Sequence, residues 1–169
     1  MVFFIRTATE RDIAALVSLL ASAWRATYLD LYGAERVEHF ISEWHSPNAV
    51  AANIARTDGE YLVADSGSRL GGMAFASLSG EGDEKVVKLH QLYVHPDCQR
   101  QGIGRDLFAE IETCFVDVKR MVLEVDPSNR HAIDFYTGVG MEEIGRTENC
   151  GPGKSGIPAL IFAKGLPAA

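Results

Sequence analysis

The sequence predicts an α/β (α+β) domain with a mixed β-sheet and helices on both of its faces. Three observations support this prediction. Apolar residues recur at helical spacing in two long stretches, whereas the segments around them alternate as strands do. Some expected strands follow one another through short polar turns and others are separated by helices, so antiparallel and parallel neighbours should occur together. One expected strand also contains a break in its alternation.

The first half of the chain is expected to form a strand, a helical region and a hairpin. Thr9 is a suitable N-cap, and the long amphipathic helix that follows it should end near Gly33. Weaker helical patterns cover residues 35–56 and are interrupted by the sequence HSPN. The expected strands are residues 2–8, 61–65 and 69–78, of which the last two form a hairpin joined at SGS.

The second half should alternate strands and helices and close with a hairpin. A strong helical pattern covers residues 103–117 and carries Phe115 in its apolar stripe. Asn129 is the N-cap of a shorter helix that ends at Gly138 or Gly140. The expected strands are residues 85–94, 121–125, 141–149 and 157–165, the last two around a turn at 150–156.

The irregular strand is the segment VVKLHQLYV. Val87 and Leu89 follow a period of two, and Leu92 and Val94 follow the same period in the opposite phase. One extra residue at His90–Gln91 would restore a single buried face, which indicates a β-bulge that also separates the strand from its neighbour. The alternative is a strand that is buried on both faces, where the phase does not matter.

Length and composition limit the classes of function and partner that fit this chain. The 169 residues suit one domain, residues 1–169, and the net charge of −7 argues against nucleic acid and against an anionic membrane surface as partners. The short apolar start of the chain is expected to be neither a signal peptide nor a membrane span. Three widely spaced cysteines without a C-x-x-C pair favour a reducing, cytoplasmic location.

The sequence QRQGIG stands where the expected strand gives way to the 103–117 helix. Two glycines at such a junction let an anion approach the free N–H groups of a helix N-terminus, and Arg100 and Arg105 add positive charge. A dinucleotide fingerprint would need a third glycine where Leu107 stands. The segment GPGKS lacks the first glycine and the helix of a P-loop, so it is interpreted as a turn. The third interpretation is the pyrophosphate loop of an acyl-CoA enzyme.

Three segments resemble the GCN5-related N-acetyltransferase (GNAT) family. QRQGIG matches the family's acetyl-CoA signature, and LHQLYVHPDCQ resembles the strand before it. NRHAIDFYTGVGM resembles a later family segment, with Met141 where phenylalanine is usual. The resemblance covers nearly the whole chain. It implies a mostly antiparallel, twisted sheet of six to seven strands with a bulged and splayed central strand.

The resemblance also implies transfer of an acetyl group from acetyl-CoA to a primary amine by direct attack on the thioester. The peptide-like pantetheine arm would pair with the edge of the splayed strand, and a backbone N–H near Leu92 could polarise the thioester carbonyl. The residues expected to bind acetyl-CoA are Leu92, Tyr93, Val94, Gln99, Arg100, Gln101, Gly102, Ile103, Gly104, Arg105, Asn129 and Tyr136.

Tyr136 matches the family's general acid, because a tyrosine hydroxyl is protonated at neutral pH and can donate to the leaving thiolate. The general base is open. Lys88 stands where many relatives carry glutamate, and a lysine is a cation that cannot accept the proton. His90, Glu124 and Glu84 are candidates, and a chain of water molecules is another.

The acceptor is either a small-molecule amine or an amine of a protein or peptide. Trp24, Tyr28 and Tyr32 lie on a helix that borders the acceptor site in relatives, so they are candidate substrate contacts as well as core residues. No histidine or cysteine spacing indicates a metal site, and a homodimer is an open expectation. A different class of function also fits, namely a non-catalytic acyl-CoA sensor, which the lysine at position 88 motivates.

Overall fold

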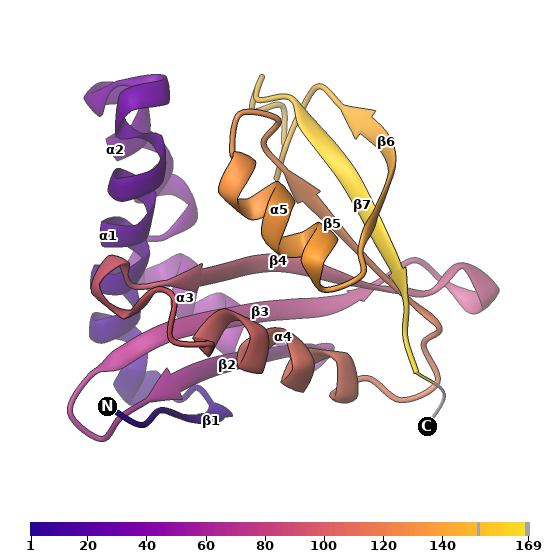
Figure 1. Cartoon of the computed structure of the whole chain (residues 1–169), viewed down its shortest axis with the longest axis horizontal. Coiled ribbons are helices and arrows are strands. Elements are labelled where there is room, and N and C mark those ends of the chain that lie inside the picture. Colours follow the sequence, from indigo (N-terminus) through magenta and orange to yellow (C-terminus); the bar gives the residue numbers. More distant parts are fainter. Residues whose placement is uncertain (152, 168–169) are drawn as a thin grey trace. The chain divides into compact units, whose positions relative to one another are not determined.

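The computed structural model describes residues 1–151 and 153–167, so Pro152 of the expected 150–156 turn lies outside the described residues. The helices and strands, shown in Figure 1, are β1 (Phe4–Thr7), α1 (Ile13–Tyr32), α2 (Ala34–Trp44), α3 (Pro47–Ile54), β2 (Gly59–Asp65), β3 (Leu70–Ser79), β4 (Val86–Val94), α4 (Ile103–Thr113), β5 (Arg120–Val125), α5 (Arg130–Gly138), β6 (Glu142–Thr147) and β7 (Ala159–Gly165). Short 3-10 turns, η1 to η3, occupy Glu10–Asp12, Gly82–Glu84 and Pro96–Cys98.

The seven strands form a mixed sheet in the order β1-β2-β3-β4-β5-β7-β6, which confirms the predicted fold class. β1 is antiparallel to β2, and β7 is antiparallel to both β5 and β6. β4 and β5 are parallel, because the chain returns through α4 between them, and a parallel pair requires such a crossover.

The chain divides into two compact units that share strands β3 and β4. The first unit comprises Met1–Phe75 and Gln91–Ile111, and the second comprises Ala76–His90 and Glu112–Ala169. Each unit is described by itself below.

In the first unit, α1 packs its apolar face on β2 and β3 and runs beside α2 (Figure 1). The core contains Leu16, Leu20, Val63, Met73 and Phe75, all at most 2% exposed. This burial of branched and aromatic side chains is the main force that holds the helix on the sheet.

Capping and an ion-pair network fix the N-terminal segment of the first unit. The predicted cap differs in its place: Thr9 precedes the 3-10 turn η1 rather than α1, and it donates its N–H and its hydroxyl to the carboxylate of Asp12 instead of accepting a hydrogen bond with its side chain. Arg6 on β1 binds both oxygens of Asp12 at 2.8 Å and also binds Asp65 on β2. Gly33, with φ of +76°, ends α1 where the sequence predicts.

In the second unit, β5, β7 and β6 lie side by side (Figure 1) and α5 follows β5. Asn129 caps α5 as predicted, since its side-chain oxygen accepts a hydrogen bond from Ala132 N at 3.1 Å.

One helix boundary differs from the prediction: α4, which begins at Ile103, ends at Thr113, so Phe115 is not part of it. A turn with φ of +62° at Asp117 follows, and it lets the chain reverse into β5.

The pairing of β4 confirms the irregularity that the sequence predicts. Parallel pairing with β5 ends at Leu89–Leu123, while β4 itself continues to Val94. His90 hydrogen-bonds Ser77, which alternation along β3 places on the face of Phe75, and Tyr93 packs on the core cluster that contains Phe75. Two side chains three residues apart therefore share one face of β4, so the alternation slips once between them.

Candidate active site

The glycine loop connects η3 with α4 in the first unit. Gly102 has φ of +86°, a conformation that side chains with a Cβ rarely adopt, and its carbonyl accepts the first helical hydrogen bond, from Asp106 N at 3.0 Å. The N–H groups of the first turn, from Ile103 to Arg105, precede that bond and have no acceptor within the helix. Gln99, Arg100, Gln101 and Arg105 are exposed around them. The loop therefore offers a set of free donors and positive charge to an anion.

Contacts within the first unit hold this loop in place. Cys98 is fully buried, and Arg69 Nη2 donates to its sulfur at 2.6 Å. His95 N donates to Gly71 O at 2.9 Å, which ties the start of the loop to β3. A Cβ at Gly72 would lie within about 3 Å of Ile103, so this glycine lets the start of α4 approach the sheet closely.

The second half of β4 supplies a strand edge. Leu92, Tyr93 and Val94 follow the last pairing of β4 with β5, and no further β5 partner exists for them among the described residues. Their side chains are half-buried. Backbone N–H and C=O groups along such an edge can pair with an extended, peptide-like ligand.

In the second unit, Lys88 and Glu124 form an ion pair between β4 and β5. Lys88 Nζ lies 3.2 Å from Glu124 Oε1, and Gly151 N donates to Glu124 Oε2 at 2.9 Å. The Cys150 thiol also hydrogen-bonds Glu124; burial, with the negative charge of Glu124 as the next cause, raises the pKa of that thiol to about 12. Glu124 is thus a carboxylate held by three donors at the first position of β5 beyond its pairing with β4.

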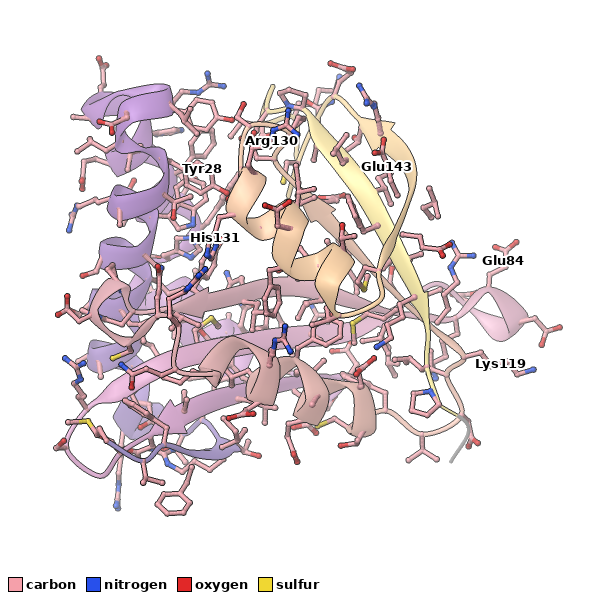
Figure 2. The ribbon with its side chains drawn as sticks, in the orientation of Figure 1. Tyr28, Glu84, Lys119, Arg130, His131 and Glu143 are labelled. Atoms are coloured by element: carbon pink, nitrogen blue, oxygen red, sulfur yellow. The ribbon has the colours of Figure 1, made fainter. Side chains whose placement is uncertain are left out.

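The other candidate bases lie elsewhere in the second unit. His90 Nε2 is 2.8 Å from Ser77 Oγ, and Ser77 is almost completely buried. Glu84 belongs to η2, at the tip of the β3–β4 hairpin, and its exposed side chain points away from the strands in Figure 2. Of the two predicted glutamates, Glu124 alone has a defined set of hydrogen-bond donors around it.

The candidate acid lies on α5. Tyr136 is half-buried, and its ring contacts that of Phe135 at a centroid distance of 5.3 Å with the planes near perpendicular. Asn129, at the start of the same helix, caps it by accepting the N–H of Ala132 with its side-chain oxygen.

The predicted acceptor contacts occupy two different environments in the first unit. Trp24 and Tyr28 are buried, with ring centroids 4.5 Å apart, and Trp24 donates to the Tyr93 hydroxyl at 3.0 Å. Tyr32 is partly exposed and lines an open hollow of about 480 Å³ at the α1–α2 junction, together with Arg36. Only Tyr32 of the three therefore presents its ring to solvent.

Comparison with known families assigns this arrangement. The acetyltransferase (GNAT) domain profile matches residues 28–157, most of the chain. The chain belongs to the GNAT acetyltransferase family. The match includes the glycine loop, both halves of β4, Glu124 and Tyr136.

Relatives of this GNAT chain act on different amines. A spermidine N(1)-acetyltransferase of Thermoplasma acidophilum is 26% identical over 140 residues, which cover 78% of this chain and 83% of that protein. The N-alpha-acetyltransferase RimI of Mycobacterium tuberculosis is 32% identical over 102 residues, which cover 59% of this chain and 62% of that protein.

Solved structures share the fold of this GNAT chain. The PaiA N-acetyltransferase of Thermoplasma acidophilum, crystallised in complex with coenzyme A, has a TM-score of 0.81 at 22% identity, covering 98% of this chain and 99% of that chain. The ribosomal-protein-S18-alanine N-acetyltransferase of Escherichia coli has a TM-score of 0.68 at 24% identity, covering 99% and 96%.

Sequence reasoning missed two features of this GNAT chain. The first is the pairing of Lys88 with Glu124 and the attachment of Gly151 to the same carboxylate. The opposite charges on neighbouring strands were a signal for the pair, but nothing in the sequence indicates the loop contact. The second is the buried His45, whose Nδ1 lies 3.4 Å from Gln91 Nε2, at the irregular part of β4.

None of the helices in residues 1–151 and 153–167 is long and apolar enough to cross a membrane. In the same residues, no group of three or more histidine, cysteine, aspartate or glutamate side chains is arranged to hold a metal ion.

Proposed function

We propose that this GNAT protein transfers an acetyl group from acetyl-CoA to a primary amine by direct attack of the amine on the thioester. The observation that carries the proposal is the glycine loop at the start of α4, where Gly102 adopts a positive φ and the exposed Arg100 and Arg105 flank the first-turn N–H groups. Such a loop suits a pyrophosphate, and acetyl-CoA supplies both that pyrophosphate and the reactive thioester.

Two segments would hold acetyl-CoA in this mechanism. Residues 99–105 bind the pyrophosphate through backbone N–H groups, with Arg100 and Arg105 adding charge attraction. Leu92 and Val94 pair their backbone groups with the pantetheine arm, since β4 lacks a β5 partner there among the described residues. The N–H near Leu92 then polarises the thioester carbonyl.

The chemistry needs one proton acceptor and one proton donor. The acceptor amine arrives as an ammonium and gives a proton to Glu124 before its nitrogen attacks the thioester carbon. As the C–N bond forms and the C–S bond breaks, the Tyr136 hydroxyl donates a proton to the leaving sulfur. The products are an acetamide and free coenzyme A.

Glu124 suits the role of base better than His90 does. The backbone N–H of Gly151 and the thiol of Cys150 hold the Glu124 carboxylate in place, and the oxygen that Lys88 contacts can take the proton once the lysine ammonium moves aside. The Nε2 atom of His90 is instead engaged with the hydroxyl of Ser77.

The relatives named above differ in their acceptors, spermidine for one and an α-amine for another by their names. These acceptors share a primary amino group. We therefore propose that the acceptor of this chain carries a primary amine, and we do not choose between a small molecule and a protein or peptide.

A thiol-release assay with acetyl-CoA and a panel of primary amines, followed by mass spectrometry of the products, tests the proposal. Release of coenzyme A with formation of an acetamide is the expected result. Calorimetry with coenzyme A provides the second measurement. Binding without turnover on any amine would favour the acyl-CoA sensor that Lys88 motivates, and absence of binding would contradict both functions.

A further inference from the structure

We infer that Lys88 is an internal competitor of the acceptor: its ammonium occupies, on the Glu124 carboxylate, the position that the acceptor ammonium takes before it loses its proton. This inference rests on the proposed function, with Glu124 as the base. It makes Lys88 a residue that sets the affinity for the acceptor.

The position of the pair along the strands supports this inference. The pairing of β4 and β5 ends at Leu89–Leu123, and Glu124 is the next residue of β5. Lys88 lies one residue before that end, and its side chain reaches forward along the sheet to Glu124. Its Nζ atom thus sits where the two strands begin to separate, only a few residues before Leu92 along β4. An acceptor ammonium that gives its proton to Glu124 has to reach the carboxylate that Lys88 contacts.

The geometry around Glu124 shows which contact can be replaced. Gly151 N holds Oε2 at 2.9 Å through the backbone, whereas Lys88 Nζ is 3.2 Å from Oε1. Charge-assisted N–H···O bonds are usually about 2.7–2.9 Å long, so the lysine contact is the looser of the two. Lysine carries its charge on a flexible four-carbon stem, and it can move aside without a change in the backbone.

The surrounding charges favour exchange of one cation for another. The charges that act on the Cys150 thiol, which hydrogen-bonds Glu124, are those of Glu124 itself, Lys88 and the buried Asp126. The thiol stays protonated at neutral pH, because burial raises its pKa to about 12. The two carboxylates carry more negative charge than Lys88 neutralises. When Lys88 moves away, the ammonium of an acceptor can replace its positive charge.

A structural ion pair and a competing ion pair predict opposite results when the lysine is removed. If Lys88 only stabilises the fold, its loss leaves the KM for the amine unchanged or raises it. If Lys88 competes with the acceptor, its loss lowers that KM. A partly exposed ion pair of this kind shifts an equilibrium by about fivefold, and we expect a fall in KM of that size.

The test measures steady-state kinetics of the full chain with acetyl-CoA and two probe amines, spermidine and a peptide with an N-terminal alanine. Lys88→Met should lower the KM for the amine about fivefold, with a smaller change in kcat and an unchanged KM for acetyl-CoA. Lys88→Arg keeps a cation on Glu124 and should not lower the KM. Lys85→Met removes an exposed lysine near the start of β4 and is the matched control, with no expected change. Lys88→Gln replaces the methionine variant if that variant does not fold.

The outcomes separate this inference from the proposed function. Thiol release with an unchanged or higher KM in Lys88→Met overturns the role of Lys88 and leaves the acetyltransferase assignment intact. A fall in KM that appears equally in Lys85→Met also overturns it, because the effect would then follow from net charge alone. No thiol release by the wild-type protein with either amine contradicts the proposed function and this inference together.

Discussion

His45 should make the stability of the first unit depend on pH in the range from 7 to 4. The side chain is 2% exposed, and its Nε2 atom has no hydrogen-bond partner among the described residues. Burial lowers the pKa of His45 from 6.5 to about 4, because the charged imidazolium would lose its hydration there. Protonation is therefore much easier in the unfolded chain than in the folded one.

The sign and the size follow from linkage. Because the folded-state pKa is the lower one, the contribution of His45 is fully present above pH 6.5 and is lost as the pH falls toward 4. The whole difference corresponds to about 3 kcal/mol of unfolding free energy, of which about 2 kcal/mol is lost by pH 5. The carboxylates contribute little in that interval, since their unfolded pKa values lie near 4.

Urea unfolding at pH 7.5 and pH 5 measures this effect. Trp24 and Trp44 are the two tryptophans of the chain, and the Trp24 ring lies 5.4 Å from that of His45, so their fluorescence reports on this unit. His45→Gln should abolish most of the pH dependence that the wild type shows. His39→Gln, which removes an exposed histidine of α2, is the matched control and should retain it. Equal pH dependence in the wild type and in His45→Gln would refute the reasoning.

Three other predictions address the N-terminal ion pair, the acid and the loop. The Arg6 hydrogen bonds lower the pKa of Asp12 to about 2, so Asp12→Asn should lower the free energy of unfolding by about 2 kcal/mol in urea at pH 7. This contribution is present above pH 4 and is lost as the pH falls toward 2. An equal loss of stability at pH 7 and pH 2 would contradict it. Tyr136→Phe should lower kcat by about 100-fold with little change in coenzyme A affinity, because it removes one proton donor; unchanged kcat would exclude that role. Gly102→Val should weaken coenzyme A binding by at least about tenfold in calorimetry, because a β-branched residue resists φ of +86°; unchanged affinity, with the fold confirmed by circular dichroism, would contradict the loop assignment.

The elements that the sequence predicts well are those with a strong local signal. Gly33 and Asn129 mark helix ends because caps and positive φ depend on a few adjacent residues. Thr9 marks only the start of the short turn η1, and α1 begins at Ile13. The slip of phase in β4 was visible because alternation in a strand has a period of two. The end of α4 was wrong because Phe115 continues the apolar spacing, although the chain turns at Asp117 with φ of +62°. Periodicity measures which residues are apolar, and it does not detect where the backbone leaves the helix.

In the site, too, the features that could be predicted are those formed by adjacent residues. The glycine loop could be predicted because the adjacent residues themselves form it. The contact of Glu124 with Gly151 could not, since it depends on a hairpin loop far along the chain, and opposite charges on two strands were the only signal for its pairing with Lys88. Trp24 is a second example. Its place on an apolar stripe of the sequence allowed either a core role or a substrate contact, and the structure shows a buried ring.

The lysine at position 88 first suggested a missing base, and the structure gives it a different meaning. The proposed mechanism uses a carboxylate to take the proton of the ammonium, and the sheet can supply it from either of the two strands that separate at Leu89–Leu123. In the mechanism that we propose, β5 supplies Glu124 as this carboxylate, and β4 supplies the cation paired with it. A partly buried carboxylate is less stable without a cation, so a carboxylate on β5 favours a positive charge on the neighbouring strand. Lys88 meets that need in the free protein, and the acceptor ammonium can meet it during the reaction. In this proposal Lys88 is compatible with catalysis, but it lowers the affinity for the acceptor.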